Sequence, residues 1–291
     1  MAFLFQDFKT SRHADTPHYL VVGHPVHHSL SPVMHRIAIE HHKLQTDYFA
    51  VDVRPDQISE FASWCNKEAF LGCNITIPHK QEFMNLVDQV DPVAQQMGVI
   101  NTIVKEPGRL TGYNTDAYGF RRPLEMYGER IEGGRVVIFG TGGASRAVAF
   151  ALTRMGIEEI IFVSRNPHKN KQPENTQVFT EFVDYNQWQE YAAETILFVN
   201  TTPVGMSPGI KETFLRDGEN VLLKEKICYD LVYNPLQTEF LRQAEMAGAI
   251  CLSGLDMLIY QGSKSFNLWT GKDFPVEKIR QALQNYFSEA S

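Results

Sequence analysis

A β-branched apolar run that leads into a glycine-rich turn and then a helix constrains the fold of this chain most. The run Val136–Phe139 is followed by GTGGASRA, and residues 147–155 are strong helix formers that end before Gly156. A short continuous apolar run is typical of a buried parallel strand. A strand, a glycine turn and a helix N-terminus in succession bring backbone N–H groups together, and such a point binds a diphosphate. The stretch therefore predicts a dinucleotide-binding α/β unit, with a tight turn that binds nothing as the alternative.

The strand that follows indicates which dinucleotide is preferred. In enzymes that use NAD, an Asp or Glu about 20 residues after the turn binds the adenine ribose. Here the next apolar strand ends at Ser164 and Arg165. A guanidinium suits bidentate binding of a phosphate, so the pattern favours NADP over NAD. The alternative is that Arg165 is a solvated surface charge.

Two alternations of strands and helices divide the 291 residues, a length that suits two domains. The first has strands expected at His18–Val22, Asp47–Val53 and Phe70–Ile77, helices from Ser31, Pro55 and Pro78, and a strand pair at Asn101–Val104 and Arg109–Tyr113. Ser31 is expected to cap its helix, with Pro32 at the first helical position. Alternation of this kind predicts mostly parallel sheets, with a border between the two α/β units near Asn114 to Arg121.

The second alternation begins at the glycine-turn strand and runs to the end of the chain. Its strands are expected at Val136–Phe139, Glu159–Val163, Ile196–Val199, Ile227–Leu231 and Ala249–Leu252. Its helices are expected at Ser145–Met155, Leu236–Ala247, Leu255–Trp269 and Val276–Phe287. The polar, proline-broken interval Asn166–Thr176 predicts a loop instead of a crossover helix.

Composition excludes several classes of partner. A net charge of −7 without a basic block argues against nucleic acid and anionic membranes. No apolar run approaches the ~20 residues of a membrane span, and the first residues lack the pattern of a secretory signal. The four cysteines show no C-x-x-C spacing, which is typical of reduced thiols in a cytoplasmic protein. The ten histidines match no zinc spacing, so no metal is expected.

Three polar clusters are candidates for the chemistry. In HSLSP, Ser29 and Ser31 lie two residues apart at an expected helix start, where both can donate to one carboxylate. In NITIPHK, Lys80 is expected in the first turn of a helix, where its charge opposes the helix dipole and a functional role is favoured. In GYNTD, Asp116 lies at the expected domain border and could form an acid–base pair with Lys80. The alternatives are a simple cap, a surface lysine and a turn aspartate.

These stretches, with others in the same order, resemble the shikimate dehydrogenase family. The similarity extends from about residue 20 to 270 through HSLSP, NITIPHK, GVINT, GYNTD, GTGGASR, NTTPVGM, DLVYNP and GLDML. The resemblance implies an N-terminal α/β substrate domain, residues 1–116 with 253–291, and a Rossmann-like NADP domain, residues 117–252. It also implies that the C-terminal helices pack back on the first domain. The activity implied is reversible reduction of 3-dehydroshikimate to shikimate with NADPH, a step in chorismate and aromatic amino acid biosynthesis.

The resemblance also implies a role for each matching residue. Lys80 and Asp116 would be the catalytic pair. Substrate would be bound by Ser29, Ser31, Thr76, Asn101, Tyr233 and Gln261. Cofactor would be bound by Gly140, Gly142, Gly143, Ala144, Ser145, Ser164, Arg165, Gly254 and Met257.

Several positions depart from the common family pattern and keep alternatives open. Ser164-Arg165-Asn166 stands where many members have Asn-Arg-Thr, Ala117 replaces a frequent Gly, and Asp256 replaces another. The tail LWTGKDFPVE resembles the quinate/shikimate dehydrogenase subgroup, which accepts both substrates and either NAD or NADP. A non-catalytic dinucleotide-binding regulator and a methylenetetrahydrofolate dehydrogenase are further alternatives. We expect a cytoplasmic monomer or homodimer whose partner is a small-molecule substrate.

Overall fold

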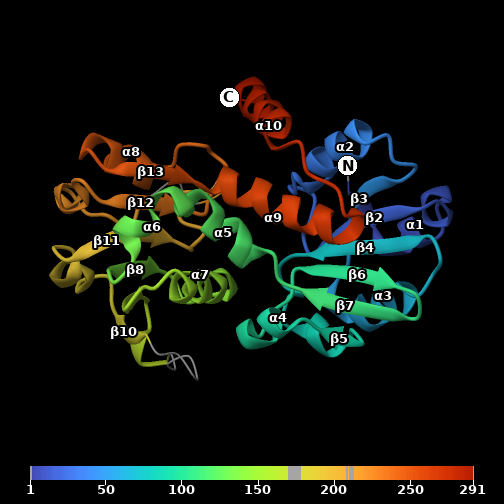
Figure 1. The fold of residues 1–291 in the computed structure, drawn as a ribbon, viewed down its shortest axis with the longest axis horizontal. Helices are drawn as coiled ribbons and strands as arrows, with labels where there is room; N and C mark the ends of the chain where they lie inside the picture. Colours follow the sequence, from blue (N-terminus) through green and yellow to red (C-terminus); the bar gives the residue numbers. More distant parts are fainter. Residues whose placement is uncertain (1, 170–177, 208, 210–212, 291) are drawn as a thin grey trace. The chain divides into compact units, whose positions relative to one another are not determined.

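The computed structural model describes residues 2–169, 178–207, 209 and 213–290 (Figure 1). The chain divides into two compact units, which are described separately. The first unit comprises Met1–Thr115 with Gln261–Leu283, and the second comprises Asp116–Tyr260 with Gln284–Ser291. The helices α9 (Gly254–Thr270) and α10 (Val276–Ala290) each contribute residues to both units.

A seven-stranded mixed sheet forms the first unit, in the order β1-β3-β2-β4-β6-β7-β5. Its strands are β1 (Phe3–Leu4), β2 (His18–Gly23), β3 (Asp47–Asp52), β4 (Phe70–Ile75), β5 (Gln89–Val90), β6 (Thr102–Glu106) and β7 (Arg109–Tyr113). The first four in the order pair in parallel, whereas β6 runs antiparallel to both β4 and β7. The strands expected from the sequence are confirmed, and β1 and β5 are two-residue additions at the edges.

Short helices connect these strands. They are α1 (Phe5–Lys9), α2 (Ser31–His41), α3 (Ile58–Trp64) and α4 (Pro92–Met97), with 3-10 turns η1 (Arg12–Asp15), η2 (Pro55–Gln57) and η3 (Glu82–Asn85). The helix α4 shows how local sequence sets the limits, because the Asp91 side chain accepts from Val93 N–H at its start and left-handed Gly98 ends it.

Two local expectations for this unit are wrong. Ser31 is the first residue of α2 and not its cap; the Ser29 hydroxyl instead accepts from the Ser31 N–H at 3.3 Å. Pro78 opens a turn followed by η3, not an α-helix. The reason lies outside the local sequence: the Lys80 carbonyl, which a helix would use internally, accepts from Ile100 N–H at 3.0 Å.

The second unit is built on a six-stranded parallel sheet in the order β10-β9-β8-β11-β12-β13. Its strands are β8 (Arg135–Phe139), β9 (Glu159–Val163), β10 (Phe179–Val183), β11 (Thr195–Asn200), β12 (Ile227–Asp230) and β13 (Ile250–Ser253). Numbered within the unit, this order is 3-2-1-4-5-6, that of the Rossmann fold. In Figure 1, β8, β11, β12 and β13 follow one another across this unit.

The helices of the second unit are α5 (Asp116–Leu124), α6 (Gly128–Ile131), α7 (Gly143–Arg154) and α8 (Glu239–Met246), with 3-10 turns η4 (Glu125–Tyr127), η5 (Pro167–Lys169), η6 (Trp188–Tyr191) and η7 (Glu219–Leu223). Asp116 is therefore the first residue of a helix. The strand β10 was not expected from the sequence, because it lies at the edge of the sheet and only Thr180 and Val183 of its five residues are buried, so it lacks a continuous apolar run. Of the predicted loop Asn166–Thr176, residues 170–176 lie outside the described residues.

Each unit has its own apolar core. The first is rich in aromatic residues: the ring of Trp64 packs edge-on against Phe8 and stacked against Phe61, with each pair of ring centroids within 6 Å. The second centres on Phe139, Trp188 and Phe198 against the sheet.

Candidate functional site

The glycine turn of the second unit lies where the order of the strands reverses. Gly140 follows β8, with φ of 106°, a conformation that favours glycine. A Cβ at Gly140 would lie 2.7 Å from the Thr201 hydroxyl at the end of β11, so glycine is also required sterically. In open parallel sheets, ligands bind at this reversal, beyond the carboxyl ends of the strands.

Space for a ligand surrounds the turn itself. A Cβ at Gly142 or Gly143 would meet no atom within 4 Å among the described residues. The helix α7 begins at this turn, and no side chain among the described residues caps it. Its first backbone N–H groups are therefore available to a ligand on the side where Gly142 and Gly143 leave space. The Ser145 hydroxyl donates to the Gly142 carbonyl at 2.6 Å and closes the turn from inside. The turn thus fits a diphosphate. Ser145 occupies the position of the third glycine in the G-x-G-x-x-G pattern, and its hydrogen bond stays within the turn.

Ser164 and Arg165 follow β9, the strand next to β8. Phe139 and Val163 are in register, so both strand ends lie at the same edge of the sheet. Ser164 is half-buried and its hydroxyl accepts from Asn166 N–H at 3.3 Å, while Arg165 is exposed. The arrangement leaves the Arg165 guanidinium on the surface at the edge that carries the glycine turn. The role of both residues in cofactor binding stays a prediction.

The ends of β12 and β13 bring Tyr233 and Gly254 into the same unit. A Cβ at Gly254 would lie 2.1 Å from the Leu231 carbonyl oxygen, so the start of α9 packs directly on the backbone after β12. Burial raises the pKa of the nearby Asp230 carboxyl to about 6, although Thr238, Val232 and Asn200 all donate to it. Burial also raises the pKa of the Tyr233 hydroxyl. Met257, on the next turn of α9, is partly exposed.

In the first unit, we call the edge at which β2, β3 and β4 end the carboxyl edge. Ser29, Ser31, Thr76 and Lys80 all come from segments that leave this edge. Ser31 is buried, whereas Ser29, Thr76 and Lys80 are partly exposed. The reversal of strand order between β2 and β4 makes this edge the place where a ligand of the first unit would bind.

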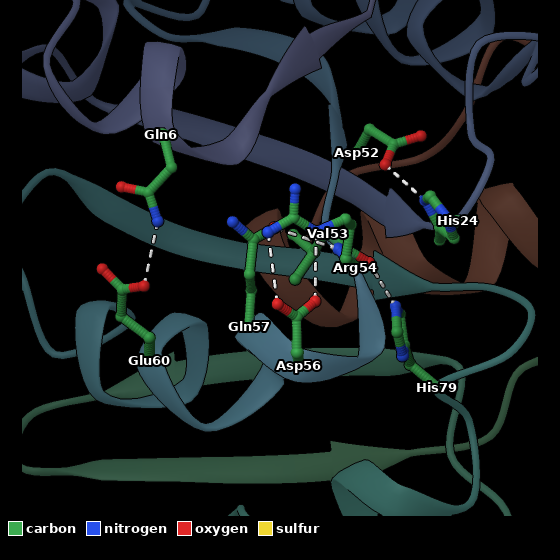
Figure 2. A network of polar contacts seen from close by, with 9 residues as sticks. All are labelled: Gln6, His24, Asp52, Val53, Arg54, Asp56, Gln57, Glu60 and His79. Carbon is green, nitrogen blue, oxygen red and sulfur yellow. Dashed lines mark hydrogen bonds and ion pairs between the residues drawn. The ribbon is translucent and has the colours of Figure 1, made fainter.

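Two histidines join the ends of the three strands at the carboxyl edge (Figure 2). His24, just after β2, bonds the Asp52 carboxylate at the end of β3 through Nδ1 at 2.6 Å. His79, between Thr76 and Lys80, bonds the Val53 carbonyl through Nε2 at 2.6 Å. The sequence analysis predicted neither contact, because the bonded residues are 28 and 26 positions apart and no local pattern links them.

Asn101 lies at the start of β6, which runs antiparallel to β4 and therefore begins at the carboxyl edge. Its side-chain oxygen accepts from Thr115 N–H at 2.8 Å, and its amide nitrogen donates to the Thr115 hydroxyl at 2.9 Å. These bonds fix the orientation of the Asn101 amide and tie it to the residue before Asp116. Gln261 is buried on α9, and its backbone carbonyl accepts from the Ser265 hydroxyl at 3.1 Å.

A buried polar network that the sequence analysis missed connects these residues. The Tyr48 hydroxyl donates to Asn74 Oδ1 at 2.7 Å, and Asn74 Nδ2 donates to the Ser265 hydroxyl at 2.9 Å. The Ser265 hydroxyl also lies 2.8 Å from that of Thr102 and 3.1 Å from that of Thr115. The one sequence signal was an asparagine in an otherwise apolar strand, because a buried amide needs partners.

Lys80 and Asp116 lie in different units, Lys80 in the turn after β4 and Asp116 at the first position of α5. Asp116 is buried, with 8% of its surface exposed. Their pairing therefore stays a prediction. His41, His42 and Asp273 bring three possible metal ligands within 4.8 Å of one another. His42 Nε2 is already bonded to the Asp273 carbonyl at 2.8 Å, so we interpret this group as a link between α2 and the loop before α10.

The second unit has an all-parallel sheet in Rossmann order and an open glycine turn, which define it as a dinucleotide-binding domain. In the first unit, polar side chains lie at the carboxyl edge, where a ligand would bind. Among the described residues, no helix is long and apolar enough to cross a membrane. This combination is typical of two-domain α/β dehydrogenases.

Comparison with known proteins identifies the family. Residues 21–103 match the shikimate dehydrogenase substrate binding domain, and residues 254–284 match the shikimate 5'-dehydrogenase C-terminal domain. The shikimate dehydrogenase (NADP(+)) of Moorella thermoacetica is 39% identical over 291 residues, covering 96% of each chain. The chain belongs to the shikimate dehydrogenase family.

Solved structures agree with this assignment. Shikimate 5-dehydrogenase from Thermus thermophilus, in complex with NADP(H) and shikimate, is 36% identical with a TM-score of 0.80, covering 93% of this chain and 99% of its own. Quinate dehydrogenase from Corynebacterium glutamicum, in complex with NAD, is 28% identical with a TM-score of 0.83, covering 93% of this chain and 99% of its own. The fold class expected from the sequence, two α/β domains of which one is Rossmann-like, is confirmed.

Proposed function

We propose that this protein is an NADP-dependent shikimate dehydrogenase that reversibly reduces 3-dehydroshikimate to shikimate. The observation that carries the proposal is the 39% identity to a shikimate dehydrogenase (NADP(+)) along 96% of both chains. The open glycine turn and the exposed Arg165 at the same sheet edge support NADP as the cofactor, because a guanidinium binds a 2′-phosphate better than it binds ribose hydroxyls.

For the domains, we propose that residues 1–116 with 253–291 form the substrate domain and that residues 117–252 form the cofactor domain. Ser29 and Ser31 donate to the substrate carboxylate near the start of α2, while Thr76, Asn101 and Gln261 bond the ring hydroxyls and Tyr233 lies near the carboxylate. The second unit would hold the dinucleotide through Gly140, Gly142, Gly143, Ala144, Ser145, Ser164 and Arg165, with Gly254 and Met257 beside the nicotinamide. The buried bonds of the Asn101 amide to Thr115 support its role, because they hold the amide in one orientation and a group that is already oriented needs little further ordering when a ligand binds.

Lys80 and Asp116 would act as the acid–base pair. NADPH, when bound, supplies the hydride. In the reduction the Lys80 ammonium gives a proton to the oxygen that becomes the C3 hydroxyl, and in the oxidation Lys80 takes that proton back. The Asp116 carboxylate orients the ammonium and balances its charge. Partial burial of Lys80 supports this role, because shielding from water strengthens the interaction with a carboxylate.

Initial rates of the wild type and of Lys80→Ala and Asp116→Ala test the proposal. Each single variant should lose about 10²–10⁴-fold in kcat, the usual contribution of a positioned acid or base. The double variant should lose far less than the product of the two losses, because groups that act as a unit are not additive. Near wild-type kcat in folded Lys80→Ala would contradict the mechanism. If the wild type does not oxidise shikimate at all, the alternative of a non-catalytic dinucleotide-binding regulator is favoured instead.

A second candidate, quinate oxidation with NAD or NADP, is favoured by the similarity to quinate dehydrogenase. Shikimate and quinate should therefore each be assayed with both cofactors. We further propose a cytoplasmic location and a monomer or homodimer, with no nucleic acid or membrane partner. Size-exclusion chromatography with light scattering decides between the oligomeric states.

A further inference from the structure

The turn that carries Lys80 is joined to its surroundings through its backbone at several points. His79 N–H donates to the Thr76 carbonyl at 3.0 Å and closes the turn. The Lys80 carbonyl accepts from Ile100 N–H at 3.0 Å, and the Ile77 carbonyl accepts from His24 N–H at 3.0 Å. These contacts hold the turn against the segment just before β6 and the segment just after β2.

His79 adds a side-chain contact to the third neighbouring strand. Its ring is fully buried, and Nε2 lies 2.6 Å from the carbonyl oxygen of Val53, just beyond β3 (Figure 2). A carbonyl oxygen can only accept, so Nε2 carries the hydrogen. Within the part of the chain that the structure describes, Nδ1 has no hydrogen-bond partner although it is buried. Burying that nitrogen costs free energy, and an apolar ring of the same shape would avoid the cost.

Packing alone would therefore favour an apolar ring at this position, and the bond to Val53 indicates that His79 has another role. We propose that His79 is a positioning residue that fixes the turn, and with it the direction in which the Lys80 side chain leaves the carboxyl edge. The inference rests on the proposed catalytic role of Lys80. Lysine has a flexible four-carbon stem, so the position and direction of the Lys80 backbone decide the region that its ammonium can reach.

The test replaces the His79 ring and measures kcat and KM separately. His79→Phe keeps the shape of the ring and removes the donor to Val53. We expect kcat to fall about 10- to 100-fold with substrate and NADP KM little changed, because a misplacement of about 1 Å costs roughly 10²-fold. His79→Gln places an amide N–H at the reach of Nε2 and should restore a kcat close to the wild type.

His18 offers a matched control in the same sheet. Its ring is also fully buried, Nδ1 bonds the Thr16 carbonyl at 2.7 Å, and Nε2 has no partner among the described residues. His18 begins β2 and so lies at the opposite edge from Lys80. His18→Phe makes the same chemical change away from the turn and should leave kcat unaltered in the folded protein.

A double variant separates a positioning role from a structural one. If His79 acts through Lys80, His79→Phe should not reduce further the residual rate of Lys80→Ala. An equal fold loss in both backgrounds, or a wild-type kcat in folded His79→Phe, would overturn the inference. If His79→Phe does not fold, His79→Asn, whose shorter amide cannot reach Val53, takes its place. If Lys80→Ala kept full kcat, the proposed function would lose its catalytic base, a different outcome from a silent His79 beside an essential Lys80.

Discussion

Replacing Asn74 with leucine should lower the stability of the first unit, although it changes the shape of the side chain only a little. Asn74→Leu keeps the branching of the side chain but removes both the acceptor for Tyr48 and the donor to Ser265, Thr102 and the Asn101 carbonyl. Tyr48 is fully buried, so its hydroxyl cannot turn to water. A buried group left without its partner costs about 1–3 kcal/mol, and the lost amide bonds add about 0.5–1.5 kcal/mol. We expect the free energy of unfolding to fall by about 2–4 kcal/mol.

Tyr48→Phe removes the same contact from the other side. It leaves Asn74 Oδ1 without its donor but keeps the amide bonds of Asn74, so the expected loss is smaller, about 1–2 kcal/mol. When Tyr48→Phe is already present no hydroxyl is stranded, and Asn74→Leu then costs less than in the wild type. The double variant should be more stable than the sum of the single losses predicts by about 1 kcal/mol or more, as for residues in direct contact.

Urea unfolding followed by tryptophan fluorescence measures these changes. Trp64 and Trp269 lie in the first unit and Trp188 in the second, so all variants are made in a Trp188→Phe background. The fluorescence then reports on the unit that contains Asn74. Losses that add within about 0.3–0.5 kcal/mol would show that Tyr48 and Asn74 are energetically independent and would refute the network as described.

Two further predictions concern pH and the cofactor. Burial lowers the pKa of His35 to about 3, below the ~6.5 of the unfolded chain, so below pH 6.5 the unfolded chain binds a proton that the folded protein does not and the free energy of unfolding falls. Between pH 7 and 5, His35→Phe should therefore lose about 2 kcal/mol less of this free energy than the wild type. Equal losses in denaturant titrations at the two pH values would contradict this. Arg165→Ala should raise the KM for NADP roughly tenfold or more and leave NAD unchanged, since a charged hydrogen bond contributes about 1.5–3 kcal/mol; equal changes for both cofactors in initial-rate assays would exclude a 2′-phosphate contact.

Local pattern determined the elements on which the cofactor unit rests. Val136–Phe139 is a strand and Gly140 a left-handed glycine because a β-branched run and a glycine turn act over a few residues. The parallel sheet followed from the alternation of such runs with helices, because parallel strands need crossover connections. Local pattern also singled out Ser29, Ser31, Lys80, Asp116 and Arg165. The family resemblance supplied the remaining candidate site residues, and the roles of all of them stay predictions.

Only the tertiary structure decided which polar side chains support that site. Asn74 meets Ser265 across 191 residues and His79 meets Val53 across 26, and neither separation has a period that a sequence pattern could reveal. The same holds for the turn after Pro78, where a distant N–H, that of Ile100, takes the carbonyl that a helix would have used. A helix or strand is set by neighbours along the chain, whereas a buried hydrogen bond is set by whichever partner the folded sheet brings within about 3 Å.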